Sequence, residues 1–128
     1  MTSTPLRLTA VAIDTPDPRA LAEFYGRLLG WEVDESASRS DWVELADPSG
    51  GPALAFQLDP DFQPPIWPGH DRPQMMHVDV RVATLDEGHE RAIAAGARQL
   101  QQPSDQLDAL FRVYADPHGH PFCMCAEA

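Results

Sequence analysis

The side chain with the clearest chemical use is His77, which lies in an apolar stretch, 75–82, whose composition is typical of a β-strand. A neutral imidazole near pH 7 can abstract a proton next to a carbonyl group, or it can bind a divalent metal ion. It can also simply line a pocket and hydrogen-bond to a neighbour. The sequence leaves these three roles open.

Two cysteines, Cys123 and Cys125, lie two residues apart in another apolar stretch, 121–125. On a strand their side chains point to the same face, and a disulfide between them would be strained. A metal site built on this pair needs further thiol or imidazole ligands, and the sequence has no second cysteine pair. We therefore interpret them as small buried apolar residues of a protein in a reducing compartment.

Other residues could bind an organic ligand. Arg112 and Tyr114 alternate with apolar residues, so they share one strand face and could together bind an anionic or phenolic molecule. An ordinary polar sheet face gives the same pattern. Trp42, Phe56 and Trp67 could line a pocket, although aromatic residues on strands also often belong to the core.

Composition excludes several classes of protein. The chain has 128 residues, a formal net charge of −11 and no lysine, so nucleic acid and anionic membrane surfaces are not expected partners. No apolar run approaches the roughly 20 residues that span a bilayer, and no secretory signal pattern opens the sequence. Phosphate-binding glycine loops and G-x-S-x-G elbows are also missing. We expect a cytoplasmic protein of one domain.

The elements that must position these residues follow from local signals. A helix is predicted over 18–29, with Asp17 as its N-cap, Pro18 at its first position and Gly30 at its end. A second helix is predicted over 85–95, after Thr84 and before Gly96. Strands are predicted at 6–13, 31–33, 41–45, 52–58, 75–82, 98–101, 111–114 and 121–125.

These elements occur twice in one order, and each copy ends in a strand that follows an Asp-Pro-x-Gly turn, at 47–50 and at 116–119. The repeat predicts one domain of two modules, about 6–58 and about 75–125. A proline-rich linker, 59–74, joins them, because its prolines cannot continue a helix or a sheet ladder. Met75 and Met76, which open the strand of the second module, are expected in the core.

Two segments carry a resemblance to a known family. Ala20-Leu21-Ala22-Glu23-Phe24-Tyr25, followed by Leu28-Leu29-Gly30-Trp31, resembles the first helix of the vicinal oxygen chelate superfamily (glyoxalase, bleomycin-resistance and dioxygenase-like domains). The segment 111–122 resembles its closing hairpin. The resemblance implies an α+β fold in which two tandem βαβββ modules form a cupped, half-open β-sheet cavity. In metal-dependent members, His, Gln and Glu from the first and last strands of the modules hold a divalent ion.

Transferred to this sequence, the ligand positions fall on Ala10, His77, a position near Gln57, and Cys123. Ala10 has no donor atom, and Cys123 stands where the resemblance implies a glutamate. A hard ion such as Mg²⁺ would lack its preferred oxygen ligand. The usual site is therefore degraded. No cofactor is expected, with a divalent Zn, Fe, Mn or Ni ion at His77 as the open alternative.

The leading hypothesis is a small-molecule-binding protein of unknown ligand, without a bound metal. The alternative is an enzyme, either a metal-dependent lyase, isomerase or dioxygenase, or a metal-free enzyme with His77 as general base. The resemblance implies a homodimer, although a two-module chain can also complete its own cavity. The residues expected to bind the ligand are Trp42, Phe56, Gln57, Trp67, Arg112, Tyr114 and Cys123.

Overall fold

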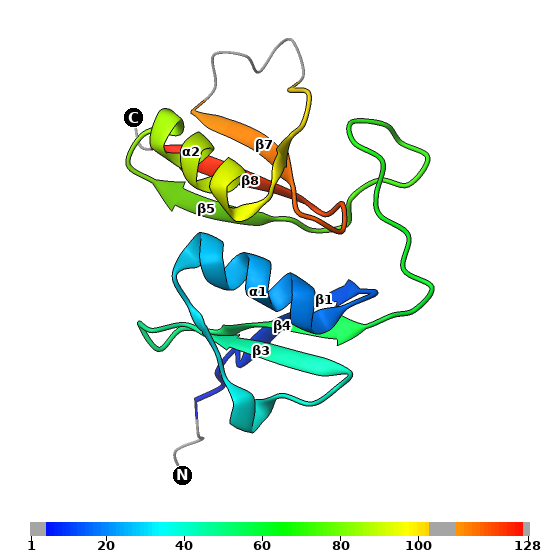
Figure 1. Ribbon diagram of the computed structural model, residues 1–128, viewed down its shortest axis with the longest axis vertical. Coiled ribbons are helices and arrows are strands. Elements are labelled where there is room, and N and C mark those ends of the chain that lie inside the picture. Colours follow the sequence, from blue (N-terminus) through cyan, green and yellow to red (C-terminus); the bar gives the residue numbers. More distant parts are fainter. Residues whose placement is uncertain (1–4, 103–109, 127–128) are drawn as a thin grey trace. The chain divides into compact units, whose positions relative to one another are not determined.

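The computed structural model describes residues 5–102 and 110–126. The chain divides into two compact units, residues 1–60 and 61–128. Each unit contains a four-stranded sheet with one α-helix over it (Figure 1). The strand order has the same form in both, so the twofold repeat predicted from the sequence is confirmed as two βαβββ modules.

In the first unit the sheet order is β1-β4-β3-β2. Strand β1 pairs with β4 in parallel, and the other pairs are antiparallel. The elements are β1 (Ala10–Thr15), α1 (Pro18–Leu29), β2 (Glu32–Val33), the short 3₁₀ helix η1 (Glu35–Ala37), β3 (Trp42–Ala46) and β4 (Ala53–Leu58).

Helix α1 begins and ends where its caps predict. The side chain of Asp17 accepts a hydrogen bond from the backbone N–H of Ala20 at 3.2 Å, and Gly30 adopts the left-handed conformation with φ of 74°. The apolar face of the helix is buried on the sheet, where the Tyr25 ring stacks on Phe56 with centroids 5.6 Å apart. This contact fixes which face of the first sheet the helix covers.

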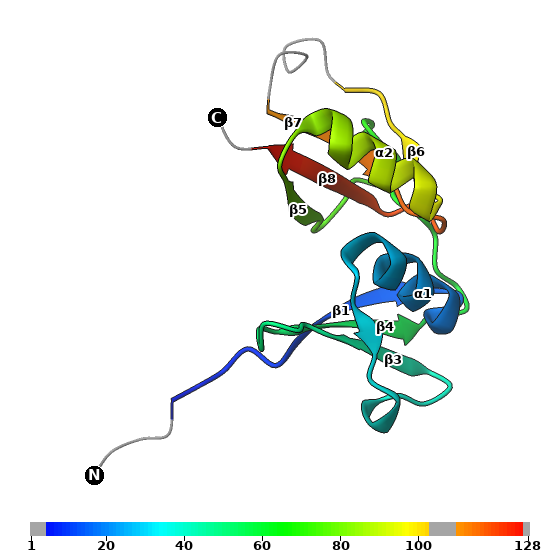
Figure 2. The same cartoon turned by 60° about the vertical axis from the view of Figure 1, so that its left-hand side comes forward.

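The second unit repeats the arrangement, with sheet order β5-β8-β7-β6. Strand β8 lies between β5, to which it is parallel, and β7, to which it is antiparallel (Figure 2). The elements are β5 (Val78–Val82), α2 (Leu85–Ala95), β6 (Arg98–Gln99), β7 (Phe111–Ala115) and β8 (Pro121–Ala126).

Helix α2 packs closely on its sheet because its buried face consists of small residues. A Cβ atom added at Gly88 would lie 3.0 Å from Val82 Cγ2 and 3.2 Å from Met124 Cβ. On the sheet side the core is formed by Tyr114, Phe122 and Met124, all buried. The helix covers one face of β5, β7 and β8, which leaves the other face for the cavity described below.

The two strands that begin the modules are shorter than predicted. Strand β1 starts at Ala10, because its partner β4 starts at Ala53, and Leu6 and Leu8 are exposed. Strand β5 starts at Val78, so the prediction that Met75 and Met76 belong to the core is wrong, with exposed fractions of 93% and 76%. Neither methionine lies where the sheet ladder could bury it.

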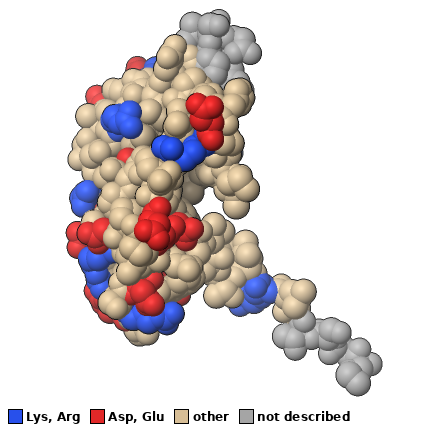
Figure 3. Space-filling view, turned by 90° about the vertical axis from the view of Figure 1, so that its right-hand side faces the viewer, with Lys and Arg blue, Asp and Glu red and all other residues tan. Residues whose placement is uncertain are grey.

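Two surface features bear on charge and on membrane spans. On the face drawn in Figure 3, acidic and basic side chains are interspersed, and its described residues form no continuous basic patch. Within 5–102 and 110–126, neither helix is long and apolar enough to cross a membrane.

Candidate functional site

A cavity of about 280 Å³ lies on the side of the second sheet that α2 does not cover. Its floor is built by strand pairing, because Cys123 on β8 lies between Asp79 on β5 and Val113 on β7. Cross-strand partners point to the same face, so all three side chains reach the cavity. The lining residues are Trp67, Gln74, His77, Asp79, Phe111, Val113, Cys123 and Cys125.

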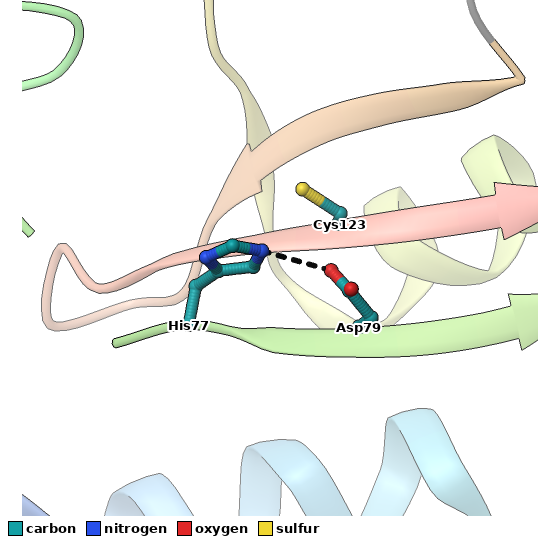
Figure 4. Close-up of side chains that lie close together, drawn as sticks. All are labelled: His77, Asp79 and Cys123. Carbon is teal, nitrogen blue, oxygen red and sulfur yellow. Dashed lines mark ion pairs between the residues drawn. The ribbon is translucent and has the colours of Figure 1, made fainter. Parts of the chain in front are cut away.

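Three donor side chains meet in this cavity. His77 Nε2 lies 3.0 Å from Asp79 Oδ1, and Figure 4 shows the Cys123 side chain beside them on β8. One ligand atom from each residue lies within 4.8 Å of the others. His77 directly precedes β5 and Asp79 is two residues further on, so the period of two for an extended chain places both on one face. We call these three residues the donor cluster.

The thiol of the donor cluster is shielded from solvent. Cys123 has an exposed fraction of 8%. Burial raises the pKa of its thiol to about 12, and the negative charge of Asp79 acts in the same direction. Burial also raises the pKa of Cys125, with Asp79 as the second cause. In the protein as it stands, both thiols are therefore protonated at neutral pH and make poor nucleophiles.

Two further residues give the cavity its binding character. The side-chain oxygen of Gln74 is buried and has no hydrogen-bond partner among the described residues. A buried acceptor of this kind is normally satisfied by a water molecule or a ligand. The indole N–H of Trp67 donates to the carbonyl oxygen of Gln101 at 2.9 Å, which holds the ring at the cavity. The cavity thus offers a fixed aromatic ring and an acceptor without a donor.

Arg112 and Tyr114 do not line this cavity, contrary to the expectation from their alternation. Both lie on the face of β7 that α2 covers. The Tyr114 hydroxyl is 2.8 Å from His89 Nδ1, and Arg112 lies 3.4 Å from the carboxylate of Asp86. Burial raises the pKa of Tyr114. The apolar residues that alternate with them, Phe111 and Val113, face the cavity instead, because the Tyr114 hydroxyl finds a partner on the helix.

The residues predicted in the first module belong to the first unit. Phe56 is fully buried beneath α1 and belongs to the core. Trp42 and Gln57 are register partners on the face of the first sheet that α1 does not cover, where the Trp42 indole N–H donates to Glu44. A second cavity of about 380 Å³ in this unit contains none of the predicted site residues.

Of the site residues predicted from the sequence, His77, Cys123 and Trp67 line this cavity, whereas Asp79 and Gln74 line it and were not predicted. Asp79 carried a readable signal. His-x-Asp at the start of a predicted strand places an imidazole and a carboxylate on the same face. No sequence pattern marked Gln74, because it lies in a segment without helix or strand, where side chains follow no regular spacing.

The sequence of the chain matches a known domain family. The sequence profile of the glyoxalase-like domain family matches residues 10–125, and the chain belongs to that family. Among curated proteins, none matches the sequence significantly.

Solved structures show the same fold at low sequence identity. A glyoxalase/bleomycin resistance protein/dioxygenase family enzyme from Burkholderia phytofirmans PsJN superimposes with a TM-score of 0.70 at 21% identity, covering 93% of this chain and 97% of that one. Protein ATC0852 from Agrobacterium tumefaciens gives a TM-score of 0.70 at 22% identity, over 98% and 99% of the two chains. A possible glyoxalase from Bacillus cereus gives 0.67 at 14%, over 95% and 100%. The similarity establishes the α+β fold of two modules.

Proposed function

We propose that this glyoxalase-like protein binds a small organic molecule in the cavity of its second module. The observation that supports the proposal most is the lining, in which the aromatic rings of Trp67 and Phe111 stand beside the polar groups of Gln74 and Asp79. Small-molecule sites combine an apolar wall with a few placed polar groups in this way. A volume of about 280 Å³ is near the lower end for such sites, which favours a compact ligand.

The buried oxygen of Gln74 indicates one feature of the ligand. An acceptor left without a donor in a cavity favours a ligand that carries an N–H or O–H group at that point. A ligand with a planar ring that packs on Trp67 or Phe111, and with one N–H or O–H group directed at Gln74, satisfies both the aromatic wall and the buried acceptor. The homodimer and the cytoplasmic location that the sequence suggested are part of this proposal, and size-exclusion chromatography of the purified chain tests the former.

The experiment is a screen of small aromatic alcohols, amines and amides by tryptophan fluorescence, in a buffer that contains a chelator. Trp67→Phe should remove most of the fluorescence response while calorimetry still detects binding, because Trp67 lines the cavity and the other two tryptophans, Trp31 and Trp42, do not. Phe111→Ala should weaken binding, whereas Phe56→Leu, which changes a residue buried under α1, should leave it unchanged. Binding that survives both Phe111→Ala and Gln74→Ala would place the ligand elsewhere and refute the proposal.

A second function, metal-free catalysis, is favoured by one contact. Asp79 Oδ1 at 3.0 Å from His77 Nε2 fixes the imidazole and leaves Nδ1 as the nitrogen that can accept a proton. In this function His77 is the general base and Asp79 is a positioning residue. Metal-free catalysis is supported by turnover that survives chelators and is lost in His77→Ala. In Asp79→Asn the turnover should remain, with a shifted pH profile. Turnover that chelators abolish supports instead the metal-dependent lyase, isomerase or dioxygenase.

A further inference from the structure

We propose that the donor cluster His77, Asp79 and Cys123 binds one divalent metal ion that accepts nitrogen and sulfur, with Zn²⁺ as the best fit. This set differs from the His, Gln and Glu ligands that the resemblance implies, since it contains a thiol and takes its carboxylate from β5. The inference goes beyond the proposed function and holds whether or not the cavity also takes an organic ligand.

The geometry of the donor cluster is close to that of a metal site. Its three ligand atoms lie within 4.8 Å of one another. Ligand atoms on tetrahedral zinc, with bonds of about 2.0–2.3 Å, are separated by about 3.3–3.8 Å. His77 and Asp79 are both partly exposed, at the cavity, and their side chains can move by this difference without disturbing the core. Cys123, fixed on the central strand β8, is the rigid member of the cluster.

The chemistry of the donors selects the ion. One imidazole nitrogen, one carboxylate oxygen and one sulfur suit Zn²⁺ and its spectroscopic substitute Co²⁺, whereas Mg²⁺ and Ca²⁺ require mostly oxygen ligands. A carboxylate and a thiolate together balance the double charge of the ion. Three protein ligands leave a fourth position for water or a ligand, as in catalytic zinc sites.

Asp79 therefore supplies the carboxylate that the closing strand lacks. The resemblance places a glutamate where Cys123 stands, and Asp79 is the direct cross-strand partner of Cys123. In the proposed site the carboxylate therefore comes from β5 instead of β8, at the same level of the sheet. Gln74, whose buried oxygen lines the same cavity, offers an acceptor for a water molecule held at the fourth position.

The test uses Co²⁺ added to untagged, chelator-treated protein and followed by absorption. We expect saturation at one Co²⁺ per chain, with a sulfur-to-cobalt charge-transfer band in the near ultraviolet that Zn²⁺ abolishes and Mg²⁺ does not. Cys123→Ser should remove this band. Cys125→Ser, a change two residues along the same strand and in the same cavity, should keep it. Asp79→Asn should weaken Co²⁺ binding by at least about tenfold, while Asp86→Asn on the exposed helix surface should not.

Circular dichroism and thermal unfolding in chelator establish that each variant is folded before it is titrated. Absence of a saturable charge-transfer band in the unmutated protein overturns the proposal. A band that persists in Cys123→Ser also overturns it, because the sulfur ligand then lies elsewhere. Affinity that is unchanged in Asp79→Asn removes Asp79 from the site and with it the proposed carboxylate shift. Since binding of an organic molecule is measured in chelator, failure here is distinct from failure of the proposed function.

Discussion

The thiol of Cys123 should be unusually slow to react with alkylating reagents. Its pKa is raised from an ordinary value of 9.0 to about 12, mainly by burial. At any pH below 9, a shift of this size lowers the thiolate fraction on the order of 1000-fold, and the thiolate is the form that reacts. The small exposed fraction of the side chain adds steric protection to this electrostatic effect.

The raised pKa of Cys123 also makes the stability of the folded protein and its alkylation rate depend on pH. A raised pKa means that the folded protein holds the Cys123 proton more tightly than the unfolded chain does. The folded state is therefore favoured below pH 9, and this contribution to stability is lost as the pH rises toward 12. Over the same range the alkylation rate of the folded protein should keep rising by about tenfold per pH unit, whereas that of the unfolded chain should level off.

The assay is iodoacetamide labelling of the Cys125→Ser protein, which leaves Cys123 as its single thiol, followed by mass spectrometry. The same protein in denaturant provides the reference rate at each pH. We expect folded and unfolded rates at pH 8 to differ by about three orders of magnitude. Rates within tenfold of each other would falsify the argument from burial and from the charge of Asp79.

Three further predictions concern the modules. Asp116→Ala should lower the free energy of unfolding, measured with denaturant, by about 2–4 kcal/mol, because this buried carboxylate accepts hydrogen bonds from His118 and His120. The exposed turn variant Asp47→Ala should lower it by about 1 kcal/mol or less, and equal losses would contradict this prediction. Tyr114→Phe should lose about 1 kcal/mol without altering ligand binding measured by calorimetry, and altered affinity would place Tyr114 in the site. Gly88→Ala should lower the midpoint of thermal unfolding, because the added methyl group is overpacked against the sheet at a cost of about 1–3 kcal/mol, which outweighs a gain in helix propensity of about 1 kcal/mol. A raised midpoint would show that the sheet can move to accept the methyl group.

The parts of the fold that could be predicted were those with local causes. Both α-helices were predicted at their observed limits, because Asp17 and Thr84 cap their first turns and Gly30 and Gly96 end them in the left-handed conformation. The starts of β1 and β5 were misplaced, since they depend on where a distant partner strand begins. Apolar composition alone does not carry that information.

The candidate site was predictable only in part, for a related reason. Alternation along β7 separates two sets of side chains but does not say which set the helix covers. Tyr114 lies beneath the helix because its hydroxyl meets His89, a contact between residues 25 positions apart. The His-x-Asp spacing indicates that Asp79 shares a strand face with His77, but its position opposite Cys123 is a property of the assembled sheet.

The donor cluster lies entirely within the second module, whereas Ala10 in the first module has no donor at the corresponding position. Substitutions in the first module therefore change none of the three donor side chains. In a chain built from a duplicated unit, one copy can then accumulate substitutions on its sheet face while selection maintains the donors in the other. The cavity proposed for an organic molecule contains the same three donors, so a substitution among them would change the preferences for metal ions and for organic ligands together.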